Sequence, residues 1–267
     1  MKLSLICISL FFCATAQVLL GQNASYSILN IPDSLLRNAN EVVRKDRQVF
    51  TVESLQSGKL SCQRVVTILN ENSEANVMVL FYDKETKIRK LEAKLYNAFG
   101  QLIREAEKSE IIDQSAISDF SIYEDTRLKG LEILHSEYPY TVVFDYEIDL
   151  KGIQFCNYPN WHIQDYASSV QEGSFSVYIP AGMRFFYRAL NIQLSPKVEK
   201  TTGQEIFTWS VRNLPAIRSE PNAPPRSAVL PLLMTAPDQF RWDAYQGSMA
   251  NWKAYGNFMY ELFKGRD

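Results

Sequence analysis

Short segments in which apolar and polar residues alternate run through most of the chain and predict β-strands. From Arg47 the pattern has a period of two, and a turn signal at residues 57–58 separates it from the β-branched run at residues 65–68, which together predict a hairpin. The same pattern predicts strands over residues 77–82, 88–96, 102–106, 130–135, 141–150, 174–179, 184–189, 192–198 and 205–211. Short strands at spacings of about 8 to 12 residues, without helical segments between them, favour antiparallel sheets. We therefore predict a mainly β chain, folded as an antiparallel two-sheet β-sandwich over residues 22–213.

Helical patterns occur near both ends of this sandwich. Residues 31–40 open with Pro32 and Asp33, which are typical of a helix start, and they predict a short N-terminal helix over the fold. Toward the C-terminus, Ser248 can cap a helix in which apolar residues recur at steps of three and four. These residues are Trp252, Tyr255, Phe258, Met259 and Leu262. We assign residues 238–267 to this C-terminal helix, whose apolar face either docks on the sandwich or links it to a following domain.

A proline-rich segment joins the sandwich to that helix. Residues 214–237 hold six of the eleven prolines of the chain. Proline fixes φ and has no amide donor, so we expect an extended run along the surface or a sheet edge, with residues 228–234 as one last strand.

The first residues have the pattern of an export signal. Lys2 precedes an apolar run over residues 3–12, and Ala14-Thr15-Ala16 is a small-x-small cleavage pattern. The apolar run is shorter than the roughly 20 residues of a membrane-spanning helix. We therefore predict a signal peptide over residues 1–21 and an exported mature chain. Cys13 follows Phe12, where a lipoprotein signal has a small residue, so lipidation is not expected.

Composition and charge exclude several classes of protein. The chain is 46% hydrophobic, which excludes disordered and collagenous proteins. With 28 basic and 30 acidic residues, it lacks the positive field that nucleic-acid binding requires. It contains no phosphate-binding glycine loop, dinucleotide fingerprint or nucleophile elbow, and we predict no cofactor.

Two cysteines remain after removal of the signal peptide, Cys62 and Cys156. In an oxidising compartment they could form a disulfide, and otherwise they are two separate buried thiols. The sequence leaves both arrangements open.

One local cluster has the residue types of a cysteine hydrolase: Cys156, His162 and Asp165. All three lie in one proline-containing loop, whereas such triads are normally assembled from distant segments. We therefore favour a structural role, with a buried thiol and Trp161 anchoring the loop, and we assign no catalytic residue.

The sequence evidence for a metal site is as weak as that for the cysteine cluster. His135 and His162 are the two histidines of the chain, too few for a typical zinc site even with Asp165. The acidic residues Asp113, Asp119, Glu124 and Asp125 lack the spacing of a calcium loop. We interpret them as a solvated loop and predict no metal.

A set of aromatic residues has two interpretations. It comprises Tyr138, Tyr140, Tyr146, Tyr158, Trp161 and Tyr166. These side chains either fill the core of the sandwich, which we favour, or form a platform on which sugars or peptides stack. The second interpretation corresponds to a binding module of the cell envelope.

Several stretches give the chain a resemblance to a known family. They include residues 41–44, 64–70, 82–83, 88–96, 99–100 and 123–129, the strand opening Tyr138-Pro139-Tyr140-Thr141-Val142, Trp161, residues 174–180 and the Trp-containing late helix. With these stretches, residues 25–267 resemble the uncharacterised N-terminal sandwich domain that precedes a transglutaminase-like core in exported proteins of Gram-negative bacteria.

The resemblance implies a fold and a partner more than an activity. In longer members of that family the transglutaminase-like core is a papain-like Cys-His-Asp core, and no stretch of this chain resembles it, so no catalytic residue is transferred. The implied function is a non-catalytic accessory or interaction domain in the periplasm or cell envelope. Its implied partner is a transglutaminase-like domain or protein, of which the chain would be a companion or a truncated member.

Overall fold

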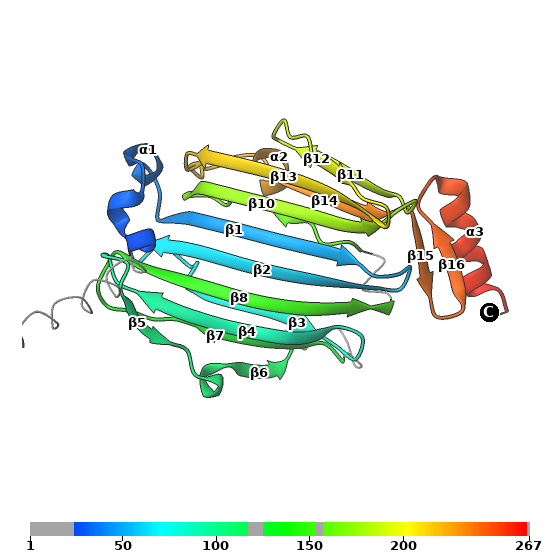
Figure 1. Cartoon of the computed structure of the whole chain (residues 1–267), viewed down its shortest axis with the longest axis horizontal. Helices are drawn as coiled ribbons and strands as arrows, with labels where there is room; N and C mark the ends of the chain where they lie inside the picture. The colour runs from blue at the N-terminus through cyan, green and yellow to red at the C-terminus, as the bar shows by residue number, and fades with distance from the viewer. Residues whose placement is uncertain (1–23, 117–124, 153–156, 266–267) are drawn as a thin grey trace, which may run out of the picture.

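The computed structural model describes residues 24–116, 125–152 and 157–265, and its main element is a large curved β-sheet (Figure 1). Its eight strands lie in the order β12-β13-β10-β1-β2-β8-β4-β5. They are β1 (Glu41–Val52), β2 (Ser57–Ile68), β4 (Lys87–Tyr96), β5 (Leu102–Glu105), β8 (Tyr140–Lys151), β10 (Ser168–Pro180), β12 (Lys197–Lys200) and β13 (Gln204–Leu214). The predicted hairpin at the start of the chain is confirmed, because β1 and β2 pair antiparallel along their whole length.

Two smaller sheets cover the inner face of the large one (Figure 1). One consists of β11 (Phe185–Leu190), β14 (Leu232–Pro237) and β9 (Trp161–His162), and the other of β3 (Val77–Tyr82), β7 (Arg127–Glu132) and β6 (Ile112–Ser115). A continuous apolar core lies between the layers and includes Phe50, Phe144, Trp161, Phe175 and Leu131. The mainly β fold is confirmed, but the second layer is two separate sheets, with no strand pairing between them among the described residues.

One strand pair departs from the predicted antiparallel pattern. β1 and β10 lie parallel, with Glu41 opposite Ser168 and Thr51 opposite Tyr178. More than a hundred residues separate the two strands in the sequence, so a tight hairpin does not constrain their directions.

Most predicted strands are present, and two predictions are wrong in detail. Residues 192–196 are irregular, and the strand begins at Lys197, although Ile192 and Leu194 still pack on the core. In the proline-rich segment, helix α2 (Arg226–Val229) replaces the first part of the predicted strand over residues 228–234. β14 follows it between β11 and β9, with proline at its end, so the segment is not confined to an edge.

A short helix at one end of the sandwich is confirmed. Helix α1 (Asp33–Leu36) follows two 3₁₀ turns, η1 (Ala24–Tyr26) and η2 (Ile28–Asn30), and its Leu35 is buried against β1 and β10. Arg44, at a bulge in β1, donates hydrogen bonds to the carbonyls of Ser25, Tyr26 and Ser27 and so fastens these turns to the sheet.

The C-terminal region is a hairpin followed by a helix, not a helix throughout. β15 (Gln239–Trp242) pairs with β16 (Tyr245–Ser248), and α3 (Trp252–Phe263) follows, capped by Asn251 instead of Ser248. Phe258 and Leu262 of α3 are buried against Phe240, whereas Trp252 is exposed. Among the described residues, no helix is long and apolar enough to cross a membrane.

A carboxylate lies inside the core, between the large sheet and β9. Asp46 of β1 is 1% exposed and accepts hydrogen bonds from the indole N–H of Trp161, at 3.0 Å, and from the amide of Gln48. The thiol of Cys62 donates to it at 3.7 Å, and the guanidinium of Arg64 lies 3.5 Å away. Buried polar groups need such partners, and the bond from Trp161 joins the two layers.

Removing this carboxylate is expected to destabilise the fold strongly. Asp46→Ala leaves the Trp161 N–H and the Gln48 amide without an acceptor, so the free energy of unfolding should fall by about 3 kcal/mol. Urea unfolding followed by tryptophan fluorescence measures it. Lys197→Ala, which removes an exposed ion pair with Glu199, is the control and should change the value by less than about 0.5 kcal/mol. Equal losses in the two variants would contradict a structural role for Asp46.

A glycine of β10 makes room for Trp161. A Cβ at Gly173 would lie 2.9 Å from the Trp161 ring and 3.0 Å from Val211. Gly173→Ala should therefore lower the free energy of unfolding by about 1–3 kcal/mol, as overpacking does. Gly203→Ala, where a Cβ meets no atom within 4 Å, is the matched control. Thermal unfolding should separate the two variants, and similar melting temperatures would contradict this packing.

Candidate functional site

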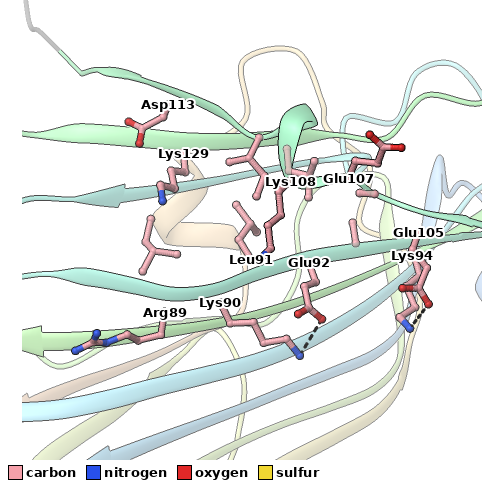
Figure 2. A pocket seen from close by; sticks show the side chains of 15 residues that line it. Arg89, Lys90, Leu91, Glu92, Lys94, Glu105, Glu107, Lys108, Asp113 and Lys129 are labelled. Carbon is pink, nitrogen blue, oxygen red and sulfur yellow. Dashed lines mark hydrogen bonds and ion pairs between the residues drawn. The ribbon is translucent and has the colours of Figure 1, made fainter.

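An open cleft lies between one edge of the large sheet and the smaller sheet of β3, β7 and β6 (Figure 2). Its volume is about 590 Å³, within the range of ligand sites. Its floor is apolar and formed by Ile88, Leu91, Ala93, Ala106, Ile111 and Leu131. Its charged rim is formed by Arg89, Lys90, Glu92, Lys94, Glu105, Glu107, Lys108, Asp113 and Lys129. The cleft therefore combines a strip of exposed core with charges of both signs.

One wall of the cleft is a strand that is partly without a neighbour. β5 pairs with Lys94, Leu95 and Tyr96 of β4, while β8 pairs with β4 from Lys87 to Tyr96. Within the described chain, residues 87–92 of β4 thus have a pairing strand on one side only. A β-bulge interrupts this stretch between Ile88 and Lys90. Such an edge presents backbone groups to a further strand, and charges and bulges limit indiscriminate pairing.

The charges on the rim are partly paired. Lys94 contacts Glu105 at 2.6 Å, and Lys90 contacts Glu92 at 3.2 Å. Lys108 and Lys129 lie within 4 Å of no carboxylate oxygen among the described residues. Lys129 lies over the ring of Tyr82, 5.6 Å from its centroid, and Lys108 points from η3 (Lys108–Glu110) toward Leu91 (Figure 2). Two lysines are therefore available to an anionic group in the cleft.

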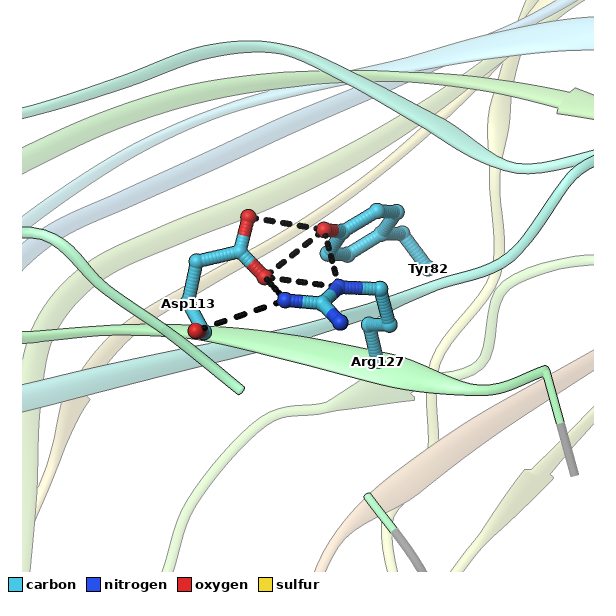
Figure 3. A network of polar contacts seen from close by, with 3 residues as sticks. All are labelled: Tyr82, Asp113 and Arg127. Carbon is cyan, nitrogen blue, oxygen red and sulfur yellow. Dashed lines mark hydrogen bonds and ion pairs between the residues drawn. The ribbon is translucent and has the colours of Figure 1, made fainter. Parts of the chain in front are cut away.

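A polar network holds Asp113 at the end of the cleft (Figure 3). The Tyr82 hydroxyl lies 2.7 Å from both carboxylate oxygens of Asp113, and Arg127 donates to the same group at 2.8 and 3.0 Å. The Tyr82 hydrogen bond, followed by Arg127, lowers the pKa of Asp113 below its ordinary value. The network joins all three strands of the small sheet and keeps this carboxylate ionised and fixed.

The opposite wall is also fixed by hydrogen bonds. Glu110 of η3 accepts from the backbone N–H of Glu107 at 2.6 Å and from Arg104 at 2.8 Å. The backbone bond first and Arg104 second lower the pKa of Glu110. Reciprocal bonds between Glu107 and Glu110 form a capping box that holds the turn carrying Lys108. The cleft is thus built from preorganised elements.

The lining of the cleft is made of charged and aliphatic side chains. It holds lysines, an arginine, carboxylates and aliphatic side chains, with no histidine, cysteine, serine or threonine.

Two residues of the predicted cysteine cluster, His162 and Asp165, lie within the described structure. Cys156 lies outside the described residues. His162 is exposed on β9, and Asp165 is paired with Arg226. Cys62 is a free buried thiol whose pKa is raised by burial and by the charge of Asp46, so it is protonated at neutral pH. The alternative of a separate buried thiol therefore holds for Cys62.

The predicted metal candidates are likewise dispersed. The ring of His135 packs edge-on against Tyr140, and Asp113 belongs to the network with Arg127. Asp119 and Glu124 lie outside the described residues, and Asp125 is exposed. In the described ranges, no group of three metal-ligating side chains occurs.

Most of the aromatic set belongs to the core, as favoured from the sequence. Tyr140, Tyr158 and Trp161 are at most 3% exposed, and burial raises the pKa of Tyr140 to about 12. Tyr146 packs on the same core. Tyr138 is exposed, and Tyr166 lies against Arg226. The residues therefore do not form one exposed stacking platform.

Sequence reasoning missed the cleft along β4. The signal present in the sequence is the number of charged residues in the strand over 87–96, which is typical of an edge. The partners of that edge come from distant residues, including Ile111 and Lys129, and no local pattern links them.

Comparison with solved structures relates the fold to part of a longer protein. A Parabacteroides distasonis protein described as a "putative protease" is similar over 75% of this chain, with a TM-score of 0.65 and 18% identity. The chain spans 41% of that protein's length. An M1 zinc metallopeptidase from Deinococcus radiodurans covers 78% of this chain and is covered over 46% of its own, at 9% identity and a TM-score of 0.35, which is too low to relate the two folds.

Comparison with curated proteins gave no match. A family profile for a domain of unknown function with solved structures, DUF3857, matches residues 56–218, which is more than half of the chain. The matched segment contains β4, β6 and β7, and hence most of the cleft. The chain belongs to the DUF3857 family.

Proposed function

We propose that this chain is a non-catalytic interaction domain that holds an extended segment of a partner protein along the free edge of β4. The observation that carries the proposal is the coincidence of residues 87–92, which pair on one side, with an apolar cleft beside them. In strand addition, backbone hydrogen bonds at a sheet edge supply affinity and adjacent pockets for alternate side chains supply specificity.

The charges of the cleft indicate what kind of segment fits. Lys108 and Lys129 face the cleft, while several other rim charges already have partners. A segment with apolar residues toward the floor and acidic residues toward these lysines would satisfy both features. Charge complementarity of this kind mainly sets specificity and the rate of association.

The partner and location follow from the resemblance and the N-terminal pattern. We propose a transglutaminase-like domain or protein as the partner and an exported location in the cell envelope of a Gram-negative bacterium. The signal-peptide pattern over residues 1–21 and the match to a longer protein described as a protease support this proposal. The accessory domain would position a segment while the chemistry takes place on the partner.

The sequence leaves two alternative functions, a binding module for peptides or sugars and a cysteine hydrolase. Binding of peptides is compatible with the same cleft. Binding of sugars has less support, because the aromatic residues that would stack on them are largely buried. A cysteine hydrolase would need a thiolate at Cys156, together with His162 and Asp165.

The purified chain is expected to have no hydrolase activity of its own. Casein hydrolysis and amine incorporation into casein should equal those of buffer, and Cys156→Ala should behave as the unaltered chain. A turnover that Cys156→Ala abolishes without a change in melting temperature would contradict the proposal. So would labelling by iodoacetamide at neutral pH that depends on His162.

Binding at the β4 edge can be tested with a fluorescein-labelled peptide of alternating valine and glutamate. Fluorescence anisotropy should show saturable binding, and Lys108→Glu with Lys129→Glu should weaken it at least about tenfold, since two attractive charges become repulsive. Lys197→Glu is the matched control, because β12 is the other edge of the same sheet. A peptide with alternate backbone nitrogens methylated should not bind. Equal binding of the methylated peptide, or an equal loss in the control, would overturn edge pairing.

A further inference from the structure

A second cavity lies where the two small sheets leave the large sheet uncovered. Its volume is about 430 Å³. The large sheet contributes Glu41 and Arg64, the side of β3 contributes Asn72, Glu74, Ala75, Val77 and Met78, and the other side contributes Asp165, Tyr166 and Arg226, with Asn40 nearby. The cavity is thus lined by opposite charges and a few apolar side chains, and it is separate from the cleft at β4.

Two arginines line this cavity, and Arg64 is the one that lies next to the buried carboxylate of Asp46. Its side chain is 26% exposed, and its contact with Asp46 is long, at 3.5 Å. Asp46 is already satisfied by Trp161, Gln48 and Cys62. A guanidinium carries five N–H donors in a planar fork that fits a carboxylate. Among the described residues Arg64 makes no shorter ion pair, so this fork has donors available to a ligand.

Glu41 is the corresponding anion at the other end. It is 9% exposed and accepts a hydrogen bond from the Ser73 hydroxyl at 2.5 Å. In the part of the chain that the structure describes, no cationic group lies within 4 Å of its carboxylate. A mostly buried carboxylate without a cation is an unusual arrangement, because buried charges are normally paired.

The distance between these charges indicates the size of a ligand. Glu41 is paired with Ile68, and Ile68 lies four residues from Arg64 on β2. At about 3.3 Å per residue, the two backbone positions lie about 13 Å apart along the sheet, a distance that a short peptide would bridge together with the lengths of the two side chains. An extended peptide of two or three residues spans about 7 to 10 Å between its termini.

We propose that this cavity binds a short zwitterionic peptide, with its terminal carboxylate on Arg64 and its terminal ammonium on Glu41. The side chains of the peptide would lie against Ala75 and Met78. At the rim, Arg226 is paired with Asp165 and lies over the ring of Tyr166. Because its charge already has a partner, Arg226 serves mainly as part of the cavity wall. The assignment is independent of the peptide edge at β4, because the two cavities share no residue.

The probe for this proposal is trialanine, added to the full mature chain and followed by isothermal titration calorimetry. Trialanine should bind saturably in the millimolar range or tighter. N-acetyl-trialanine and trialanine amide, each lacking one terminal charge, should bind at least about tenfold more weakly. Absence of saturable binding, or equal affinity for the three peptides, would overturn the proposal.

Variants assign each end of the peptide to its residue. Glu41→Gln should weaken trialanine about tenfold and leave N-acetyl-trialanine unchanged, because that peptide has no ammonium. Arg64→Lys keeps the positive charge next to Asp46 and should weaken trialanine but not trialanine amide. Lys108→Glu, in the other cleft, should leave trialanine binding unchanged. If Glu41→Gln weakens all three peptides equally, the ammonium does not lie on Glu41 and the proposed orientation is wrong.

Discussion

The carboxylate of Asp46 is the constraint on which the two-layer arrangement depends. It lies in an otherwise apolar core, where an ionised group is costly unless hydrogen bonds satisfy it. Trp161, from β9, supplies one of these bonds across the layers, and Gln48 and Cys62 supply others within the large sheet. The position of the small sheet of β11, β14 and β9 is therefore fixed by a directional hydrogen bond in addition to apolar packing. Gly173 is the counterpart of this contact, since the Trp161 ring occupies the space of a side chain there.

The division of the second layer creates both cavities. A single covering sheet would enclose Arg64, which is 26% exposed, and its charge would then need a closer partner within the core. Because β9 and β3 do not pair, a polar strip of the large sheet stays accessible between them. On the other side of the small sheet of β3, β7 and β6, strand β6 does not pair with β4. The apolar floor around Leu91 is therefore open. Both cavities are thus gaps between layers and not pockets within a loop.

The two cavities differ in how they would recognise a ligand. The cleft at β4 offers backbone groups and an apolar floor, which suit a long extended segment. The cavity over Arg64 has a charge at each end, which suits a ligand of limited length. The Tyr82, Asp113 and Arg127 network and the capping box at Glu107 fix the walls of the first cleft, which would reduce the entropy lost when a segment binds there.

The sequence by itself determined the strands, since the alternation around Phe50 and the β-branched run at Val65 reflect burial on one face of a pleated strand. It also predicted the aromatic core and the short first helix. It did not determine how the strands share sheets, because pairings such as β1 with β10 join residues far apart. The apolar pattern after Ser248 does form the predicted helix, α3, but residues 239–248 of the segment assigned to it form a hairpin, whose Phe240 packs on Phe258. Both candidate sites combine residues from strands that meet only in the folded chain, and tertiary structure alone brings Lys129 to β4 or Tyr166 to Arg64.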